Sequence, residues 1–455
     1  MKYRRHAVLA TLAAIVTTAA VWSIVRSTRT GDEELLFAAR RAFYQGRIPE
    51  AAELAQQSLS RRPDWQEALV VAGRSAALLG DTEGAIGYLE RAVPEGGYLA
   101  TEAAFSAAEL HEKMHRASRA EGLYRQVLQA EATHRAALER LTRLLNVTGR
   151  RWEAAPYLLE LVRKGEQNPE TLILLGDMEA IVEDPDELNS MRKAAPDDAV
   201  PLLGLARLAF ARGDSPAAET LSRQALQRDP NLIDAHALLG TALLQSDDQP
   251  GLAAWQASLP NAAAAHPQIW LVRGLWARGH DQDRAACRCF WEALRRDPNN
   301  AVAHQQLSTL LDPEHASRGH EMLVARTDLL TRLNDTLRRL HQARHKLSDL
   351  PDAVGQMSSA ATLCEQAGRL WEAWAWNDLV LKEDPRNSHA LKEFSRIGGL
   401  LTAGTPQVLT VHNPSAVINL SAYPLPTWPT TGEAAAENPP SPTAESRVGA
   451  SAASE

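Results

Sequence analysis

The residues with the clearest potential for chemistry are His111-Glu112-Lys113-Met114-His115, which match the pattern H-E-x-x-H. Two histidines with this spacing can bind zinc when they share one helix face, and the glutamate between them can then act as a general base. The neighbours Lys113 and Arg116 are charged, and no third ligand follows at a familiar spacing. A zinc hydrolase is therefore one candidate function, but we interpret the pattern as a coincidence and predict that the chain is not an enzyme.

The other histidines and the cysteines give weaker indications of a metal site or of disulfide bonds. His341 and His345 are four residues apart in a predicted long helix, residues 320–347, with no glutamate between them. The chain has only three cysteines, Cys287, Cys289 and Cys364, an odd number that does not favour a disulfide framework. We expect these cysteines to be small buried residues, and we predict no metal and no cofactor.

These residues must be positioned by a repeated unit, because one phrase recurs along the chain: a glycine turn, an alanine-rich amphipathic stretch and a closing proline. When the copies are aligned on Pro63, Pro230, Pro298 and Pro385, the unit is about 34 residues long. Alanine occupies the twentieth place of seven copies, and glycine occupies the eighth place of four units. The clear copies are residues 32–65, 66–100, 101–134, 135–168, 199–232, 267–300 and 354–387, and the degenerate ones are 169–198, 233–266 and 301–320.

This register resembles the tetratricopeptide repeat, which has small residues at the eighth and twentieth places and a proline near the end. The resemblance implies an all-α fold, a right-handed superhelical solenoid of helix-turn-helix repeats over residues 31–400, with about nine or ten repeats. Small residues at these places let two antiparallel helices approach closely. In the same register, His111 falls at a packing position and His115 falls in the turn between two helices.

The resemblance also implies a groove, because the second, fifth, ninth and twelfth places of each repeat face the concave surface in family members. The ninth place is arginine in several copies, and apolar residues stand beside it. The candidate partner-binding residues are Arg40, Arg74, Arg143, Arg207, Phe43, Phe105 and Phe210. Arginine can bind a carboxylate or a backbone carbonyl, and the apolar neighbours can hold side chains of a peptide. The alternative is that these arginines pair with nearby Glu or Asp and only solubilise the groove.

The N-terminus, residues 1–30, contains a segment with the length of a membrane span. Ala7–Val25 carries no charged residue, and Lys2, Arg4 and Arg5 precede it. A basic leader before an apolar segment favours a cytoplasmic N-terminus. We therefore predict a single-pass anchor with the solenoid on the extracytoplasmic, periplasmic side. The alternative is a signal peptide that is cleaved near Ala20, after which the chain is exported.

Composition limits the remaining function classes and marks the end of the solenoid. The net charge is −8 and is spread along the chain, so we expect no nucleic-acid partner. Residues 401–455 are rich in Pro, Ala and Ser, and we predict that they are mostly disordered. Within them, the apolar segment Val417–Trp428 is unusual for a solvated tail. It can fold back on the solenoid or dock on a partner.

Taken together, the sequence predicts a membrane-tethered scaffold that binds a protein or peptide in its groove and assists assembly of an envelope complex, with no small-molecule substrate. A second possibility is a homo-oligomeric structural subunit in which the solenoid ends and the cluster Trp371, Trp374 and Trp376 pack between copies. For this cluster, the alternative is packing inside the chain, against the 320–347 helix and the helix after Pro385.

Overall fold

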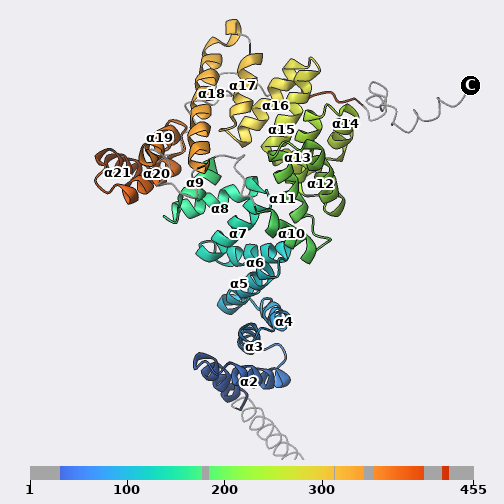
Figure 1. The fold of residues 1–455 in the computed structure, drawn as a ribbon, viewed down its shortest axis with the longest axis vertical. Helices are drawn as coiled ribbons and strands as arrows, with labels where there is room; N and C mark the ends of the chain where they lie inside the picture. The colour runs from blue at the N-terminus through green and yellow to red at the C-terminus, as the bar shows by residue number, and fades with distance from the viewer. Residues whose placement is uncertain (1–30, 177–183, 312, 343–351, 404–422, 430–455) are drawn as a thin grey trace, which may run out of the picture. The chain divides into compact units, whose positions relative to one another are not determined.

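The computed structural model describes residues 31–176, 184–311, 313–342, 352–403 and 423–429 (Figure 1). Every regular element in these ranges is a helix, which confirms the predicted all-α class. The chain divides into two compact units, Met1–Leu141 (unit 1) and Thr142–Glu455 (unit 2). None of the described helices is both long enough and apolar enough to cross a bilayer, and the predicted anchor Ala7–Val25 lies outside the described residues.

Unit 1 is a run of antiparallel helices connected by short turns. After a first helix over residues 31–44, its helices are α2 (Ile48–Arg61), α3 (Gln66–Leu79), α4 (Thr82–Ala92), α5 (Gly97–Lys113), α6 (Ala117–Ala130) and the first part of α7 (Arg135–Val147). The turn between α3 and α4 shows how the sequence ends one helix and begins the next. Gly80 takes a left-handed conformation (φ 86°), and the Asp81 side chain accepts a hydrogen bond from the Gly84 N–H at 2.9 Å.

Unit 2 continues with helices of more variable length. They are α8 (Arg151–Arg163), α9 (Pro169–Gly176), α10 (Pro185–Ala194), α11 (Val200–Ala211), α12 (Ser215–Arg228), α13 (Ile233–Gln245), α14 (Gln249–Ser258), the 3-10 helix η1 (Asn261–Ala265), α15 (Pro267–Gly279), α16 (Asp283–Arg296), α17 (Ala301–Leu310), α18 (Pro313–Gln342), α19 (Ala353–Gln366), α20 (Leu370–Glu383) and α21 (Ser388–Thr402). The shorter helices α10, α14 and α17 all lie in the degenerate copies.

Small residues at two places of the repeat allow the helices of a pair to pack closely. The alanines at the twentieth place are completely buried: Ala51, Ala85, Ala120, Ala154, Ala218, Ala286 and Ala373. At the eighth place, a Cβ on Gly274 would lie 2.5 Å from the ring of Phe290, and a Cβ on Gly73 would lie 2.6 Å from Leu89. Phe290 and Leu89 both occupy the twenty-fourth place, so glycine makes room for the large residue of the partner helix.

The closing prolines have a second role that the register did not predict. The ring Nε2 of His236 lies 2.9 Å from the carbonyl oxygen of Pro230, and that of His304 lies 3.0 Å from the carbonyl oxygen of Pro298. Because a carbonyl oxygen only accepts, each imidazole donates to it. Both histidines are buried, and burial lowers the pKa of His236 below its ordinary value. Each histidine thus joins the start of one repeat to the end of the one before.

In unit 2 the later helices fold back on the earlier ones, which a strictly linear solenoid does not do. The Gln167 side chain donates to Asp378 of α20 at 2.7 Å, and Arg369 donates to the Leu175 carbonyl of α9 at 3.2 Å. A Cβ on Gly176 would lie 2.4 Å from Leu337 of α18. Helices α18 and α20 both pack against α9, in addition to α8, its neighbour along the chain.

The long helix of this region differs from its predicted bounds. Helix α18 begins at Pro313, before the predicted start at 320. Proline is favourable at the first position of a helix because its missing N–H would have no partner there, so the helix starts at this residue. Residues 343–347 of the predicted helix lie outside the described residues.

Candidate functional site

The H-E-x-x-H residues make side-chain contacts within unit 1. His111 is buried, and its Nε2 lies 2.9 Å from the Oε1 of Glu90 on α4. Glu112 accepts a hydrogen bond of 2.7 Å from the Tyr124 hydroxyl on α6. His115 follows the end of α5 and has a left-handed backbone (φ 57°). The predicted positions are confirmed, with His111 in the packing and His115 in the turn, so the two histidines do not share a helix face.

In the part of the chain that the structure describes, no cluster of three or more His, Cys, Asp or Glu side chains is placed to hold a metal ion. His341 belongs to α18, whereas His345 lies outside the described residues. The three cysteines are free and buried, and burial raises the pKa of Cys287 to about 11 and that of Cys289 to about 12. Their thiols therefore stay protonated at neutral pH, which makes them poor nucleophiles.

The tryptophan cluster is part of the packing of unit 2. Trp376 is completely buried, and Trp374 stacks on Phe394 of α21 with the ring centroids 4.8 Å apart. Trp371 meets Trp374 edge to face at 6.2 Å and has the guanidinium of Arg163 over its ring at 6.0 Å. The predicted packing against the helix after Pro385 is confirmed. Trp371 also contacts Arg163 of α8, which the sequence did not predict, and the packing against the long helix stays a prediction.

The candidate binding residues of unit 1 form one exposed surface. We define the Arg74 surface as Phe37, Arg40, Phe43, Tyr44 and Arg74. The first four follow one another along the helix over residues 31–44, and the Arg74 guanidinium on α3 lies 5.1 Å from the centre of the Phe43 ring. The ring of Phe43 also meets that of Tyr44 edge to face at 5.9 Å.

Two large aromatic side chains and two arginines of this surface face solvent. Phe37 is 69% exposed and Tyr44 is 76% exposed. Arg40 and Arg74 are exposed, and neither forms an ion pair with a described residue. A shallow pocket adjoins this surface, and its lining residues are Glu33, Leu36, Phe37, Arg40, Arg62, Trp65 and Glu67. Exposed aromatic rings beside available guanidinium groups are typical of surfaces that bind proteins.

Phe105, the other aromatic residue predicted to bind a partner in unit 1, does not belong to the Arg74 surface. It is half-buried, and its ring centroid is 4.9 Å from that of His134 and 5.9 Å from that of Tyr124. Phe105 thus packs between α5, α6 and the start of α7. Its contribution in the structure is to the core of unit 1.

The candidate residues of unit 2 are engaged in contacts of their own. Arg143 donates two hydrogen bonds to the carboxylate of Glu187, at 2.8 and 2.7 Å. The side chain of Arg207 lies against Gly149 and donates to its carbonyl oxygen at 3.5 Å. Phe210 is half-buried against the core of α11 and α13. For Arg143 the structure matches the alternative interpretation, in which the arginine pairs with a carboxylate.

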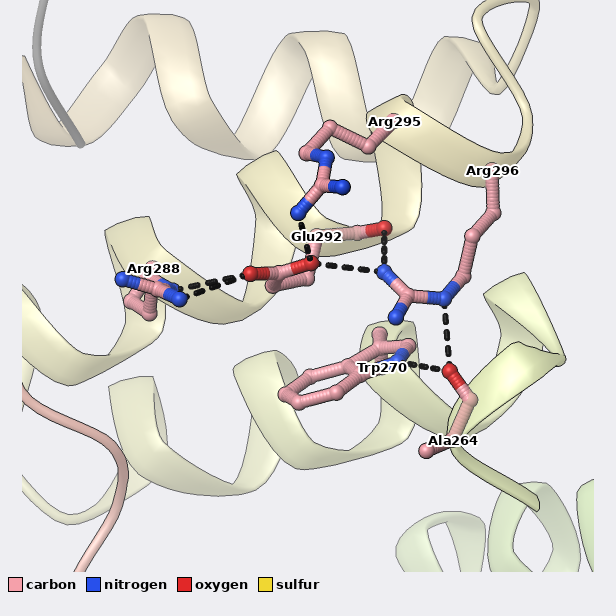
Figure 2. Close-up of polar contacts among 6 residues, drawn as sticks. All are labelled: Ala264, Trp270, Arg288, Glu292, Arg295 and Arg296. Atoms are coloured by element: carbon pink, nitrogen blue, oxygen red, sulfur yellow. Dashed lines mark hydrogen bonds and ion pairs between the residues drawn. The ribbon is translucent and has the colours of Figure 1, made fainter. Parts of the chain in front are cut away.

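A second group of arginines, which the sequence did not single out, surrounds one buried carboxylate. Glu292 accepts hydrogen bonds from Arg288 at 3.0 Å, Arg295 at 3.2 Å and Arg296 at 2.7 Å, as Figure 2 shows. Arg296 also donates to the Ala264 carbonyl oxygen at 2.6 Å, and that oxygen accepts a further bond from Trp270. The cluster therefore joins the last turn of α16 to η1, and each of its three arginines bonds within the protein.

The end of the apolar tail segment lies on unit 2. Tyr423 and Trp428 pack against the core formed by α13–α16, and the dark red stretch of chain in Figure 1 runs beside these helices. Of the two predicted possibilities, the structure shows folding back for residues 423–429, whereas residues 417–422 lie outside the described residues. The receiving residues, chiefly Trp255, Trp276 and Gln282, were missed. The sequence carried one indirect signal for these three residues. The apolar tail segment needs a surface to pack against, so some residues of the solenoid had to receive it.

Residues 38–100 match the sequence model of the tetratricopeptide repeat. They span the end of the first helix, α2, α3, α4 and the start of α5, and they include most of the Arg74 surface. No curated protein matches the chain.

Several solved structures of repeat proteins are similar to the chain. The TPR domain of P58(IPK) is 12% identical, with a TM-score of 0.26, and the match covers 83% of this chain and 99% of that chain. A tetratricopeptide repeat protein from Parabacteroides merdae ATCC 43184 is 14% identical, with a TM-score of 0.25 and coverage of 62% and 99%. The APC/C hetero-tetramer Cut9-Hcn1 is 14% identical, with a TM-score of 0.29 and coverage of 86% and 90%. At TM-scores this low, the similarities support no argument about this chain.

Proposed function

We propose that the chain, of which residues 38–100 match the tetratricopeptide repeat, is a scaffold that binds an extended segment of a partner protein on the Arg74 surface. Tetratricopeptide repeats mediate protein–protein interactions. The observation that carries the proposal is that Arg74 stacks on Phe43 and remains exposed, with no carboxylate among the described residues as its partner.

The chemistry of this surface defines the class of partner. A guanidinium that stacks on an aromatic ring keeps its N–H edge available, and this edge matches a carboxylate or a pair of carbonyl oxygens. Phe37 and Tyr44 offer apolar area within one or two helical turns of Arg40. The expected partner is therefore an extended peptide segment that carries at least one carboxylate beside apolar side chains.

The proposal is tested by charge reversal with a matched control. The double variant Arg40→Glu/Arg74→Glu reverses both available charges, whereas Arg41→Glu reverses an exposed charge on the same helix, about 100° around the helix axis from Arg40. Proteins captured from membrane extracts by the wild type are expected to be lost with the double variant and retained with Arg41→Glu. Equal capture by all three proteins, with unchanged thermal unfolding, would contradict the proposal.

The scaffold is further proposed to be tethered to a membrane and to act in the assembly of an envelope complex. What supports this is the segment Ala7–Val25, which has no charged residue and follows the basic leader Lys2, Arg4 and Arg5. Nineteen residues at about 1.5 Å per residue are long enough to cross a hydrocarbon core of about 30 Å. The basic residues would remain on the cytoplasmic side, which places both units on the other side.

The anchor is tested by a reporter that is active only after export. Alkaline phosphatase fused after Ala403 is expected to be active and to stay with membranes after alkaline carbonate extraction. The same fusion without residues 1–30 is expected to be inactive. An active fusion that is released in soluble form would favour cleavage near Ala20 and would contradict the anchor.

A further inference from the structure

The segment Tyr423–Pro429 makes contacts with unit 2 that resemble those of a bound peptide. The indole of Trp428 stacks on that of Trp276, with the ring centroids 3.7 Å apart and the planes at 14°. It also meets Trp255 edge to face at 6.2 Å. At the other end of the segment, the guanidinium of Arg284 lies 5.0 Å from the centre of the Tyr423 ring. Two aromatic side chains, five residues apart, thus anchor the segment.

Between these anchors, one side chain recognises the peptide backbone. The amide of Gln282 donates from Nε2 to the Thr427 carbonyl oxygen at 3.0 Å, and its Oε1 accepts from the Thr427 N–H at 2.9 Å. Both polar groups of one backbone residue are therefore satisfied by a single side chain. Such a pair of bonds holds an extended chain and does not depend on the side chain at position 427.

The receiving surface is oriented by bonds that do not involve the segment. Trp255 donates from its indole N–H to the His236 carbonyl oxygen at 2.9 Å, and Trp276 donates to Gln249 at 3.1 Å. Trp276 also stacks on His280, with the centroids 4.2 Å apart. Because both indoles are fixed by the helices themselves, the surface is organised before a peptide arrives, which lowers the entropic cost of binding.

The segment is also suited to binding as an extended chain. Its sequence, YPLPTWP, has proline at positions 424, 426 and 429. Proline fixes φ near −65° and favours the polyproline II conformation, so the chain loses little freedom when it binds. The described residues of the segment form neither helix nor strand, in agreement with this.

We propose that Trp255, Trp276, Gln282 and Arg284 form a binding site for Pro-rich peptides with the spacing Tyr-Pro-x-Pro-x-Trp, and that the chain's own segment Tyr423–Pro429 occupies this site as a tethered ligand. A partner peptide of the same chemistry binds there by displacing the tail. The site lies in unit 2 and uses neither Arg40 nor Arg74, so it is independent of the function proposed above.

The tether gives the proposal a measurable consequence. Because residues 404–422 connect the segment covalently to residue 403, the segment stays near its site at an effective concentration on the order of millimolar. A free peptide must compete with this concentration in the wild type. It does not have to do so in Trp428→Ala, which removes the main anchor of the tail and leaves the receiving surface intact.

The test is the binding of a fluorescein-labelled synthetic peptide of residues 421–431 to the full-length protein, measured by fluorescence anisotropy. The peptide is expected to bind Trp428→Ala at least about 10-fold more tightly than it binds the wild type. Adding Gln282→Ala to Trp428→Ala is expected to weaken binding at least about 10-fold, since both backbone hydrogen bonds are lost. Arg40→Glu/Arg74→Glu is expected to leave peptide binding unchanged.

The control peptide carries Ala in place of Trp at the position that matches residue 428 and is expected not to bind. Gln282 is half-buried, and its side-chain hydrogen bonds to described residues all go to Thr427, so Gln282→Ala should unfold at the same temperature as its parent, and a melting curve checks this. Equal binding of the peptide to the wild type and to Trp428→Ala, or no effect of Gln282→Ala, would overturn the proposal. Dimers of the wild type that Trp428→Ala abolishes would overturn the tethered arrangement, because the tail would then bind a second copy.

Discussion

At the scale of single residues, the polar side chains of the H-E-x-x-H pattern connect helices of unit 1. The ring of His111 forms a hydrogen bond with Glu90 on α4, and Glu112 accepts a hydrogen bond from the hydroxyl of Tyr124 on α6. The repeat register predicted that His111 packs and that His115 lies in a turn. It could not predict Glu90 as the partner, because Glu90 comes from the preceding repeat and the register fixes only places within one repeat.

Replacing His111 therefore affects stability. His111→Ala is expected to lower the free energy of unfolding by about 1–2 kcal/mol, because the bond to Glu90 and the packing of a buried ring are lost. His111→Gln keeps an N–H donor and should cost less. Urea denaturation of the three proteins measures the difference. Stoichiometric zinc in the purified wild type that disappears in His111→Ala would contradict this role.

At the scale of elements, the contact between the helices of a pair is the part of the fold that the sequence predicts best. Glycine or alanine at the eighth and twentieth places is required for helices to approach, so the pattern is visible without a structure. The start of α18 at Pro313 follows the preference of proline for the first position of a helix, a sequence signal that the predicted start at 320 missed. The packing of α18 on α9 was not predictable, because the two helices are far apart in sequence and meet only through the fold.

The glycine places give a direct test of close packing. In Gly274→Ala, a Cβ 2.5 Å from the Phe290 ring forces one of the two helices to shift. Overpacking of this kind costs about 1–3 kcal/mol, which exceeds the gain of up to about 1 kcal/mol in helix propensity. Gly279→Ala, on the same helix with open space around it, is the control and should be neutral or slightly stabilising. A Gly274→Ala protein as stable as the wild type would show that the helices are not in close contact there.

The histidines that join consecutive repeats give a prediction for pH. Burial lowers the pKa of His236 below the ordinary histidine value of about 6.5, so the folded state favours the neutral ring. Below a pH of about 6.5 the unfolded chain binds a proton that the folded chain resists, and stability is lost as the pH falls. The melting temperature should therefore decrease from pH 7 to pH 5, and His236→Gln should make this decrease smaller. His389→Gln, which changes an exposed histidine, is the control, and a pH dependence unaffected by His236→Gln would refute the assignment.

At the scale of the whole molecule, the chain combines two units with separate candidate surfaces. Unit 1 carries the Arg74 surface within residues 38–100 and the adjoining helix, and unit 2 carries the site of the tail. The sequence predicted the helical class and the need for the apolar tail segment to be covered, whereas the binding role of Arg40 and Arg74 stays a prediction. It did not predict that Arg143 pairs with Glu187, because the two residues are far apart in sequence and meet only through the packing of α7 and α10. Nor could it predict the tryptophans that receive the tail, because buried tryptophan is common in helical cores.

The most direct test of the central claim is the dissociation constant of the partner segment that the wild type captures. The measurement compares the wild type with Arg74→Glu and with Arg41→Glu. Reversing one charge of the Arg74 surface should weaken binding at least about 10-fold, which corresponds to about 1.4 kcal/mol, whereas Arg41→Glu should bind as the wild type does. A dissociation constant that is the same for all three proteins would contradict the claim that this surface binds the partner.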